Sequence, residues 1–170
     1  LVANKYRKDL LQSPRGVESL GKVYFWFTNQ KEEVFYRIKL ALPQRQLEVN
    51  LQRKLALLKE LEKEYSQIAS LGGGEWGLGA MYKTAMAYRQ MATDVANAPV
   101  PSELSAEQVD LYRAEIQKQM VKPFSEKAFS LSQNCLDKAQ EFNLFSDWTS
   151  RCYSLAGEYE KERFPLVRTF

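Results

Sequence analysis

The stretch "LGGGEWGLGAMY", residues 71–82, decides between two kinds of fold. Its glycines match G-x-G-x-x-G, a pattern that holds the pyrophosphate of a dinucleotide when it follows a β-strand. Here Tyr65, Ile68 and Leu71 continue a helical spacing into the glycines, so no strand leads into the pattern. We therefore interpret the glycines as a turn between two helices and not as a nucleotide site.

The residues on both sides of this turn predict two helices. The first is a long helix over 44–71, which begins after Pro43 and carries Lys54 in the one polar slot of its apolar series. Its apolar residues follow a 4,3,4,3 spacing and are Leu47, Leu51, Leu58, Leu61, Tyr65 and Ile68. The second helix is expected over 75–97. We interpret the 4,3,4,3 series as packing within the chain, and a dimeric coiled-coil seam is the alternative.

The remaining segments also predict helices. The segment "VYFWFTNQKEEVFYRIKLAL", residues 23–42, fits a helix better than a strand, and residues 13–16 separate it from a shorter first helix. Its expected apolar face comprises Val23, Phe27, Val34, Phe35 and Ile38. Ser105 with Gln108 forms a capping-box pattern, and Pro123 either kinks the helix that follows or starts another. A last helix is expected after Ser146.

These segments predict an all-α fold with about seven helices in stacked antiparallel hairpins. We expect a single domain over residues 1–170, in which N-terminal helices occupy 1–42, the long helix 44–71 and C-terminal helices 75–165. The chain begins without Met, so we interpret it as a fragment of a longer protein.

The composition excludes several classes of chemistry. The 170 residues include no histidine, which excludes Ser-His-Asp and Cys-His catalysis and histidine-based zinc sites, and two cysteines are too few for an all-cysteine zinc site. The net charge is only +3 with both signs interspersed, so nucleic acid is not an expected partner. The apolar runs are far shorter than the ~20 residues that span a bilayer. We predict no catalytic, cofactor-binding or metal-binding residues and no transmembrane segment.

The two cysteines lie on the apolar faces of consecutive predicted helices. Cys135 and Cys152 are nearly symmetric about the turn at 143–145, so an antiparallel hairpin would bring them to the same level. A disulfide needs their Cα atoms within about 7 Å of each other, and two buried free thiols are the alternative. An oxidising compartment would permit the bond.

The segment 44–165 contains four distinctive pieces, which are Gly-Glu-Trp at 74–76, Ala-Pro-Val-Pro at 98–101, Leu-Tyr-Arg at 111–113 and Asp-Trp-Thr at 147–149. With these pieces the segment resembles the C-terminal region of deltaproteobacterial tetratricopeptide-repeat (TPR) proteins associated with adventurous gliding motility. Leu78, Gly79 and Tyr82 fit the W-x2-L-G-x2-Y core of a TPR unit, whereas the Trp lies one place later than that core requires. The resemblance implies an irregular, right-handed TPR-like solenoid.

The resemblance also implies a function and a location. It implies a non-catalytic scaffold that binds other proteins of the bacterial cell envelope, in the periplasm or at the outer membrane. The residues we single out as candidates for contact with a partner are Trp76, Tyr82, Pro99, Pro101, Tyr112 and Trp148. Each has an alternative structural role, since amphipathic rings at helical spacing commonly pack between helices and prolines stiffen a turn.

An enzyme is the competing hypothesis. "GEWGLGAMY" loosely resembles the Gly-Leu-Met-Gln region of lytic transglycosylases, peptidoglycan-cleaving enzymes in which one glutamate acts as the general acid. The candidate is Glu75. A general acid of this kind needs a raised pKa in a cleft, whereas a helix N-terminus favours the ionised carboxylate, so the sequence favours the scaffold.

Overall fold

The computed structural model of the chain describes residues 5–72 and 74–165, and all of its regular secondary structure in these ranges is helical. The elements are α2 (Arg7–Leu10), α3 (Pro14–Arg37), α4 (Gln44–Ala69), α5 (Glu75–Ala96), α6 (Ala106–Ile116), the π-helical turn η1 (Gln117–Val121), α7 (Lys122–Glu141) and α8 (Asp147–Tyr159). The all-α prediction is therefore confirmed over the described part of the chain.

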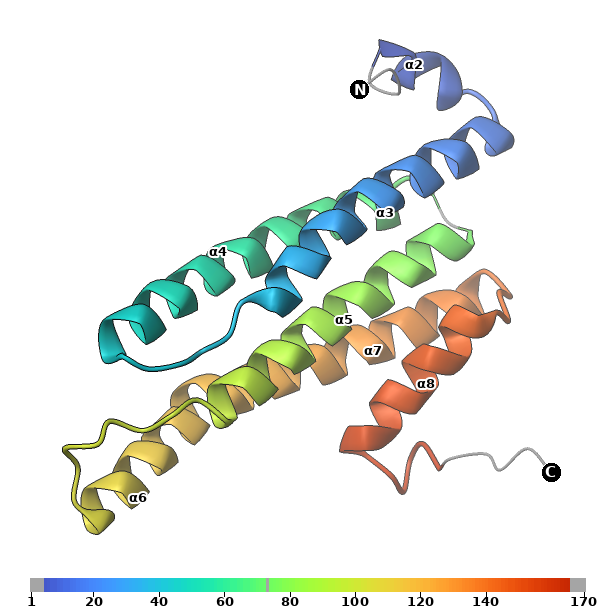
Figure 1. Cartoon of the computed structure of the whole chain (residues 1–170). Helices are drawn as coiled ribbons and strands as arrows, with labels where there is room; N and C mark the ends of the chain where they lie inside the picture. The colour runs from blue at the N-terminus through green and yellow to red at the C-terminus, as the bar shows by residue number, and fades with distance from the viewer. Residues whose placement is uncertain (1–4, 73, 166–170) are drawn as a thin grey trace.

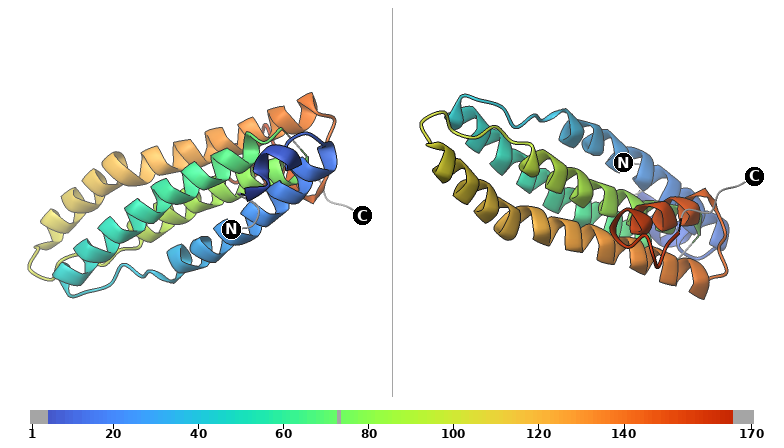
Figure 2. Two further views of the ribbon diagram at one scale, coloured as in Figure 1. Left: turned by 90° about the horizontal axis from the view of Figure 1, so that it is seen from above. Right: turned by 90° about the horizontal axis from the view of Figure 1, so that it is seen from below.

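The helix α5 lies at the centre of an elongated bundle (Figure 1). It packs against α3 and α4 on one side and against α7 and α8 on the other. Consecutive long helices run antiparallel, so that the α4–α5 and α7–α8 turns lie at one end and α6 lies at the other (Figure 2). Small residues make this central position possible, because Gly77, Gly79, Ala80 and Ala87 of α5 are all buried.

The turn between α4 and α5 has the role that the glycine pattern predicts. Gly72 and Gly74 both have positive φ, at 105° and 78°, a conformation that costs glycine no steric strain. Gly74 is the residue directly before α5, and Gly77 lies buried within that helix. The third glycine of the turn, Gly73, lies outside the described residues. The long predicted helix ends at Ala69, two residues before the position expected from the sequence.

The number of helices is lower than expected because Pro123 does not end a helix. α6, η1 and α7 follow one another without a break from Ala106 to Glu141, and the π-helical turn ends two residues before Pro123. Proline has no N–H to donate to the preceding turn, and a π-helical turn absorbs that loss without ending the helix. With this run counted once, the described residues contain six helices, α2 included, where about seven were predicted.

The start signals of two helices are confirmed, whereas the expected apolar face at 23–38 is confirmed only at Phe35 and Ile38, which are buried. Ser105 caps α6 through the expected capping box with Gln108, and α8 begins directly after Ser146. The expected α3 face included three residues that are at least one-third exposed, namely Val23, Phe27 and Val34. The buried α3 residues that the prediction omitted include Leu20, Phe25, Thr28 and Glu32.

Lys54 joins α3, α4 and α5 at one buried point. Its side chain is completely buried, and its ammonium donates hydrogen bonds to the carbonyl oxygens of Phe35 (2.8 Å) and Ile38 (3.1 Å). The same nitrogen lies 2.6 Å from Oδ2 of Asp94 on α5. Phe35 lies in the last turn of α3, where no further helical N–H is available, and Ile38 directly follows that helix, so the lysine supplies donors that this helix end lacks.

We expect Lys54→Met to destabilise the protein strongly. The substitution would leave Asp94 without its cation and the α3 carbonyls without their donors, and breaking a buried pair in this way costs roughly 3–5 kcal/mol. Urea denaturation followed by circular dichroism would measure the free energy of unfolding. Lys59→Met, on an exposed position of the same helix, is the matched control and should change it little. Equal effects of the two substitutions would contradict the role given to Lys54.

Candidate protein-interaction surface

Three of the aromatic candidates belong to one cluster, in which Trp76 and Trp148 contact Phe25 and Tyr82 contacts Trp148. The Phe25 ring centroid lies 5.3 Å from that of Trp76 and 5.7 Å from that of Trp148, and Tyr82 lies 5.8 Å from Trp148. These contacts join α3, α5 and α8. Trp76, Tyr82 and Trp148 are all partly buried, so most of their surface is used to pack helices together.

Gly79 permits this aromatic packing. A Cβ atom placed on Gly79 would lie 2.9 Å from Cε2 of Trp148 and 3.1 Å from Cε2 of Phe25, which is closer than carbon atoms approach without repulsion. Gly77, one half-turn earlier in α5, is under no such restriction, because a Cβ atom there would lie 3.8 Å from its nearest neighbours, in the Ala69 backbone. The absence of a side chain at Gly79 is therefore what lets α3 and α8 meet over α5.

We expect Gly79→Ala to destabilise the protein by about 1–3 kcal/mol, since overpacking forces neighbouring rings out of place. Near-ultraviolet circular dichroism should also change, because the surroundings of Trp148 are altered. Gly77→Ala is the matched control, and it should be neutral or slightly stabilising because alanine favours helix more than glycine does. A Gly79→Ala variant as stable as Gly77→Ala would show that the rings do not pack as described.

The other three candidates lie at the opposite end of α5. Pro99 and Pro101 are partly buried in the connection between α5 and α6. Tyr112 lines an apolar hollow of about 190 Å³ together with Val100, Ile116 and further residues of α4, α5 and η1. The structure therefore splits the six candidates into two groups of three, which lie toward opposite ends of α5.

Cys135 and Cys152 are joined as a disulfide between α7 and α8. Their sulfur atoms lie 2.08 Å apart, their Cα atoms lie 6.2 Å apart, and both side chains are completely buried. The bond closes a loop with a sequence separation of 17 residues, and a cross-link of that span stabilises a fold by about 3 kcal/mol. It fixes the α7–α8 hairpin behind the aromatic cluster.

A group of exposed apolar side chains on α3 is a further candidate surface that the sequence analysis missed as a site. Val23, Trp26, Phe27 and Val34 lie on the side of α3 that faces away from the core, and we call this set the α3 outer stripe. Trp26 is 58% exposed, and its ring packs edge-on against that of Phe27 at 4.9 Å. Exposed aromatic residues grouped on one helix are typical of binding surfaces. The signal was present in the sequence, because α3 is apolar on two sides.

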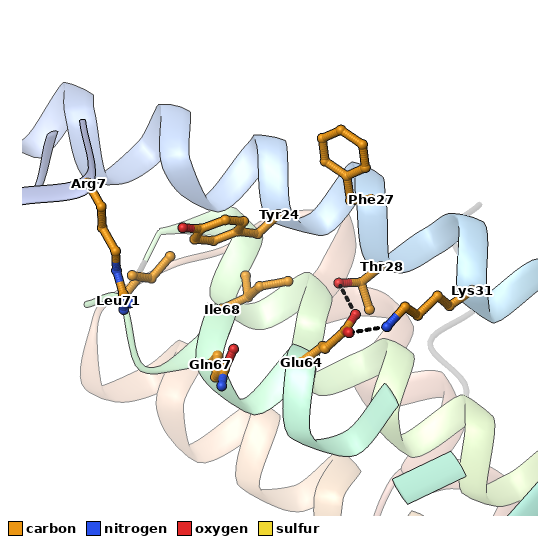
Figure 3. Close-up of a pocket in the computed structure, with 9 residues that line it drawn as sticks. All are labelled: Arg7, Tyr24, Phe27, Thr28, Lys31, Glu64, Gln67, Ile68 and Leu71. Carbon is orange, nitrogen blue, oxygen red and sulfur yellow. Dashed lines mark hydrogen bonds and ion pairs between the residues drawn. The ribbon is translucent and has the colours of Figure 1, made fainter. Parts of the chain in front are cut away.

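A hollow lies on either side of the α3 outer stripe. One has a volume of about 370 Å³ and is lined by Lys22, Asn29, Trp76 and the stripe itself. The other, of about 500 Å³, lies between α3, α4 and Arg7 (Figure 3). Figure 3 shows the Phe27 ring on the side of α3 away from Glu64. The stripe is therefore a ridge between two depressions.

Three polar side chains of the second hollow bind one another. Thr28 donates a hydrogen bond to Oε2 of Glu64 (3.1 Å), and the Lys31 ammonium contacts Oε1 of the same carboxylate. The contact between Lys31 and Glu64 is the main reason why the pKa of Lys31 is raised. The Glu64 carboxylate therefore links α4 to α3. Because Thr28, Lys31 and Glu64 bind one another, these three groups are not directed at a ligand in the hollow.

A second buried charge pair joins α3 to α5. Oε2 of Glu32 accepts a hydrogen bond from the Lys83 ammonium at 2.6 Å, whereas Oε1 is buried without a hydrogen-bond partner. Burial raises the pKa of Glu32, and the Lys83 ammonium offsets only part of that rise. The protonated carboxyl group is thus favoured more in the folded than in the unfolded chain.

This shift predicts a pH dependence of stability. Because the pKa of Glu32 is higher in the folded state, the protonated carboxyl group contributes to the free energy of unfolding. This contribution is fully present below about pH 4.5 and is lost as the pH rises through the folded pKa. As the pH increases from 4 to 7, the wild type should therefore lose stability relative to Glu32→Gln. Urea denaturation at several pH values in this range would measure the difference. Glu33→Gln, at the exposed neighbouring position, should not reproduce the difference. A difference between wild type and Glu32→Gln that does not change with pH would contradict the shift.

The alternative catalytic candidate lies on the surface. Glu75 is exposed in the first turn of α5 and borders a hollow together with Leu11, Gly72 and Leu144. It lacks the apolar burial that raises the pKa of a general acid. Within 5–72 and 74–165, no three His, Cys, Asp or Glu side chains form a group that could hold a metal ion. In the same ranges, none of the helices combines the length and apolarity needed to cross a membrane.

Comparisons of the chain with protein-family models, with curated proteins and with solved structures find no match. The resemblance to motility-associated TPR proteins therefore stays a prediction from the sequence motifs.

Proposed function

We propose that this chain is a non-catalytic protein–protein interaction module that binds its partner through the α3 outer stripe. The observation that carries the proposal is the exposure of Val23, Trp26, Phe27 and Val34 together on one helix, between 36% and 58% each. Leaving such side chains in water is unfavourable, by about 25 cal/mol for each Å² of apolar surface. A partner that covers the stripe would recover that free energy.

The rigidity of α3 supports this role. The helix is anchored at its C-terminal end by Lys54 and in its middle by the Glu32–Lys83 pair and the rings around Phe25. A surface fixed in this way loses little conformational entropy when a partner binds, which favours affinity. The stripe is thus a preorganised surface.

The resemblance to TPR proteins adds a setting to the proposal. It implies a module within an irregular right-handed helical solenoid of the cell envelope, in the periplasm or at the outer membrane, with a link to gliding motility. The antiparallel order of consecutive helices is in keeping with such a solenoid, although α3, α4 and α5 have 24, 26 and 22 residues and exceed the helices of a 34-residue repeat. The Cys135–Cys152 bond suits an oxidising compartment such as the periplasm.

The two alternative functions have less support. Glu75 as the acid of a lytic transglycosylase lacks the apolar burial that such an acid needs. The 4,3,4,3 series of α4 does not present a coiled-coil seam to another chain, because Leu58, Leu61 and Tyr65 are buried within the bundle. A seam on α4 would require those residues to be exposed.

A photo-crosslinking experiment tests the proposal. Benzoylphenylalanine replaces Trp26 in the full-length protein, which is irradiated in the cells that make it. We expect a cross-linked product of defined mass, because position 26 lies in the partner interface. The matched control carries the probe at Val49, which is 54% exposed on α4 and lies outside the stripe. Products of equal yield at both positions, or none at position 26, would contradict the proposal.

A further inference from the structure

The outward side of α3 has the spacing of a helix-packing seam. Val23, Phe27, Gln30, Val34 and Arg37 follow one another at intervals of 4, 3, 4 and 3 residues, and all five are exposed. This spacing keeps side chains on one line along a helix and matches the seam of a two-stranded antiparallel or parallel helix pair. The occupant that fits such a line is another α-helix.

The charges beside the seam favour an antiparallel helix, and they fit a second copy of α3 as that helix. Lys22 and Glu33 are exposed on the same flank of the seam, eleven residues apart, and the Glu33 carboxylate also accepts a hydrogen bond from Arg37 of its own helix (3.1 Å). If a second α3 lay antiparallel, with the crossing between Thr28 and Asn29, Val23 would face the partner's Val34. Lys22 would then lie within one turn of the partner's Glu33, and the symmetric contact would occur twice. In a parallel second α3 the two copies of this flank would lie on opposite sides of the seam, so Lys22 would not meet the partner's Glu33.

We propose that the α3 outer stripe is a self-association surface, through which two copies of this chain pair by antiparallel packing of α3. The inference rests on the proposed function, since it names the partner of the same stripe. A twofold axis makes the contact self-complementary, so one helix supplies both halves of the interface. The ridge formed by Phe27 and the hollows on its two sides give each copy both the protruding and the receiving shape.

Sedimentation equilibrium of the full 170-residue chain, at concentrations up to about 1 mM, tests the pairing. We expect the mass to rise with concentration from 19.7 kDa toward twice that value. Lys22→Glu and Glu33→Lys should each raise the dissociation constant by roughly tenfold, because each variant creates two repulsive contacts per dimer. The double variant Lys22→Glu/Glu33→Lys should return it to within about threefold of the wild-type value, since the pairs are restored with reversed sign.

Further variants separate the stripe from the rest of the surface. Trp26→Ser/Phe27→Ser should abolish the association, whereas Val49→Ser, an exposed apolar position on α4, should leave it unchanged. Circular dichroism would verify that each variant is folded. Association that survives loss of the stripe, or charge reversals without mutual rescue, would overturn the antiparallel pairing.

A chain that stays monomeric at every concentration would also overturn the pairing, but it would leave the proposed function testable on its own. In that case a cross-link from position 26 to a different protein would retain the interaction module and reject self-association. Absence of any cross-link from position 26 would reject both.

Discussion

The orientation of α3 depends on the buried ammonium of Lys54. A charge with no exposed surface is tolerated only where acceptors surround it, and here the carbonyls of Phe35 and Ile38 and the carboxylate of Asp94 do so. These acceptors come from the end of α3 and from α5, while the lysine comes from α4. A rotation of α3 about its axis would break this set, so one face of α3 is held inward and the opposite face outward.

The central helix α5 also constrains α3, because it has no side chain at Gly79. α5 presents Gly79 where a side chain would collide with Phe25 and Trp148, so rings from α3 and α8 meet across it. The aromatic candidates Trp76, Tyr82 and Trp148 use most of their surface in this packing. The disulfide between α7 and α8 fixes the hairpin behind them. The apolar surface left outside is that of α3, which is why the functional proposal moves there.

Local patterns predicted much of the fold. The glycine turn before α5, the extent of α4 and the cap at Ser105 depend on short-range chemistry, and all three are present. The inward face of α3 could not be predicted in the same way, because α3 carries two apolar faces and periodicity alone does not choose between them. The choice depends on Glu32 meeting Lys83, 51 residues further along the chain, and a buried carboxylate is not expected from sequence. The same ambiguity hides the site, since the predicted apolar face places Val23, Phe27 and Val34 of the α3 outer stripe in the core, whereas all three are exposed.

Hydroxyl-radical footprinting of the full chain at low and high protein concentration tests the two-faced character of α3 most directly. At low concentration Trp26 and Phe27 should be oxidised rapidly, whereas Phe25 and Phe35, which are 5% and 0% exposed, should be protected. At high concentration Trp26 should become protected while an exposed residue outside the stripe, such as Phe145, stays reactive. Oxidation of Phe25 as fast as that of Trp26, or a Trp26 rate independent of concentration, would contradict this account.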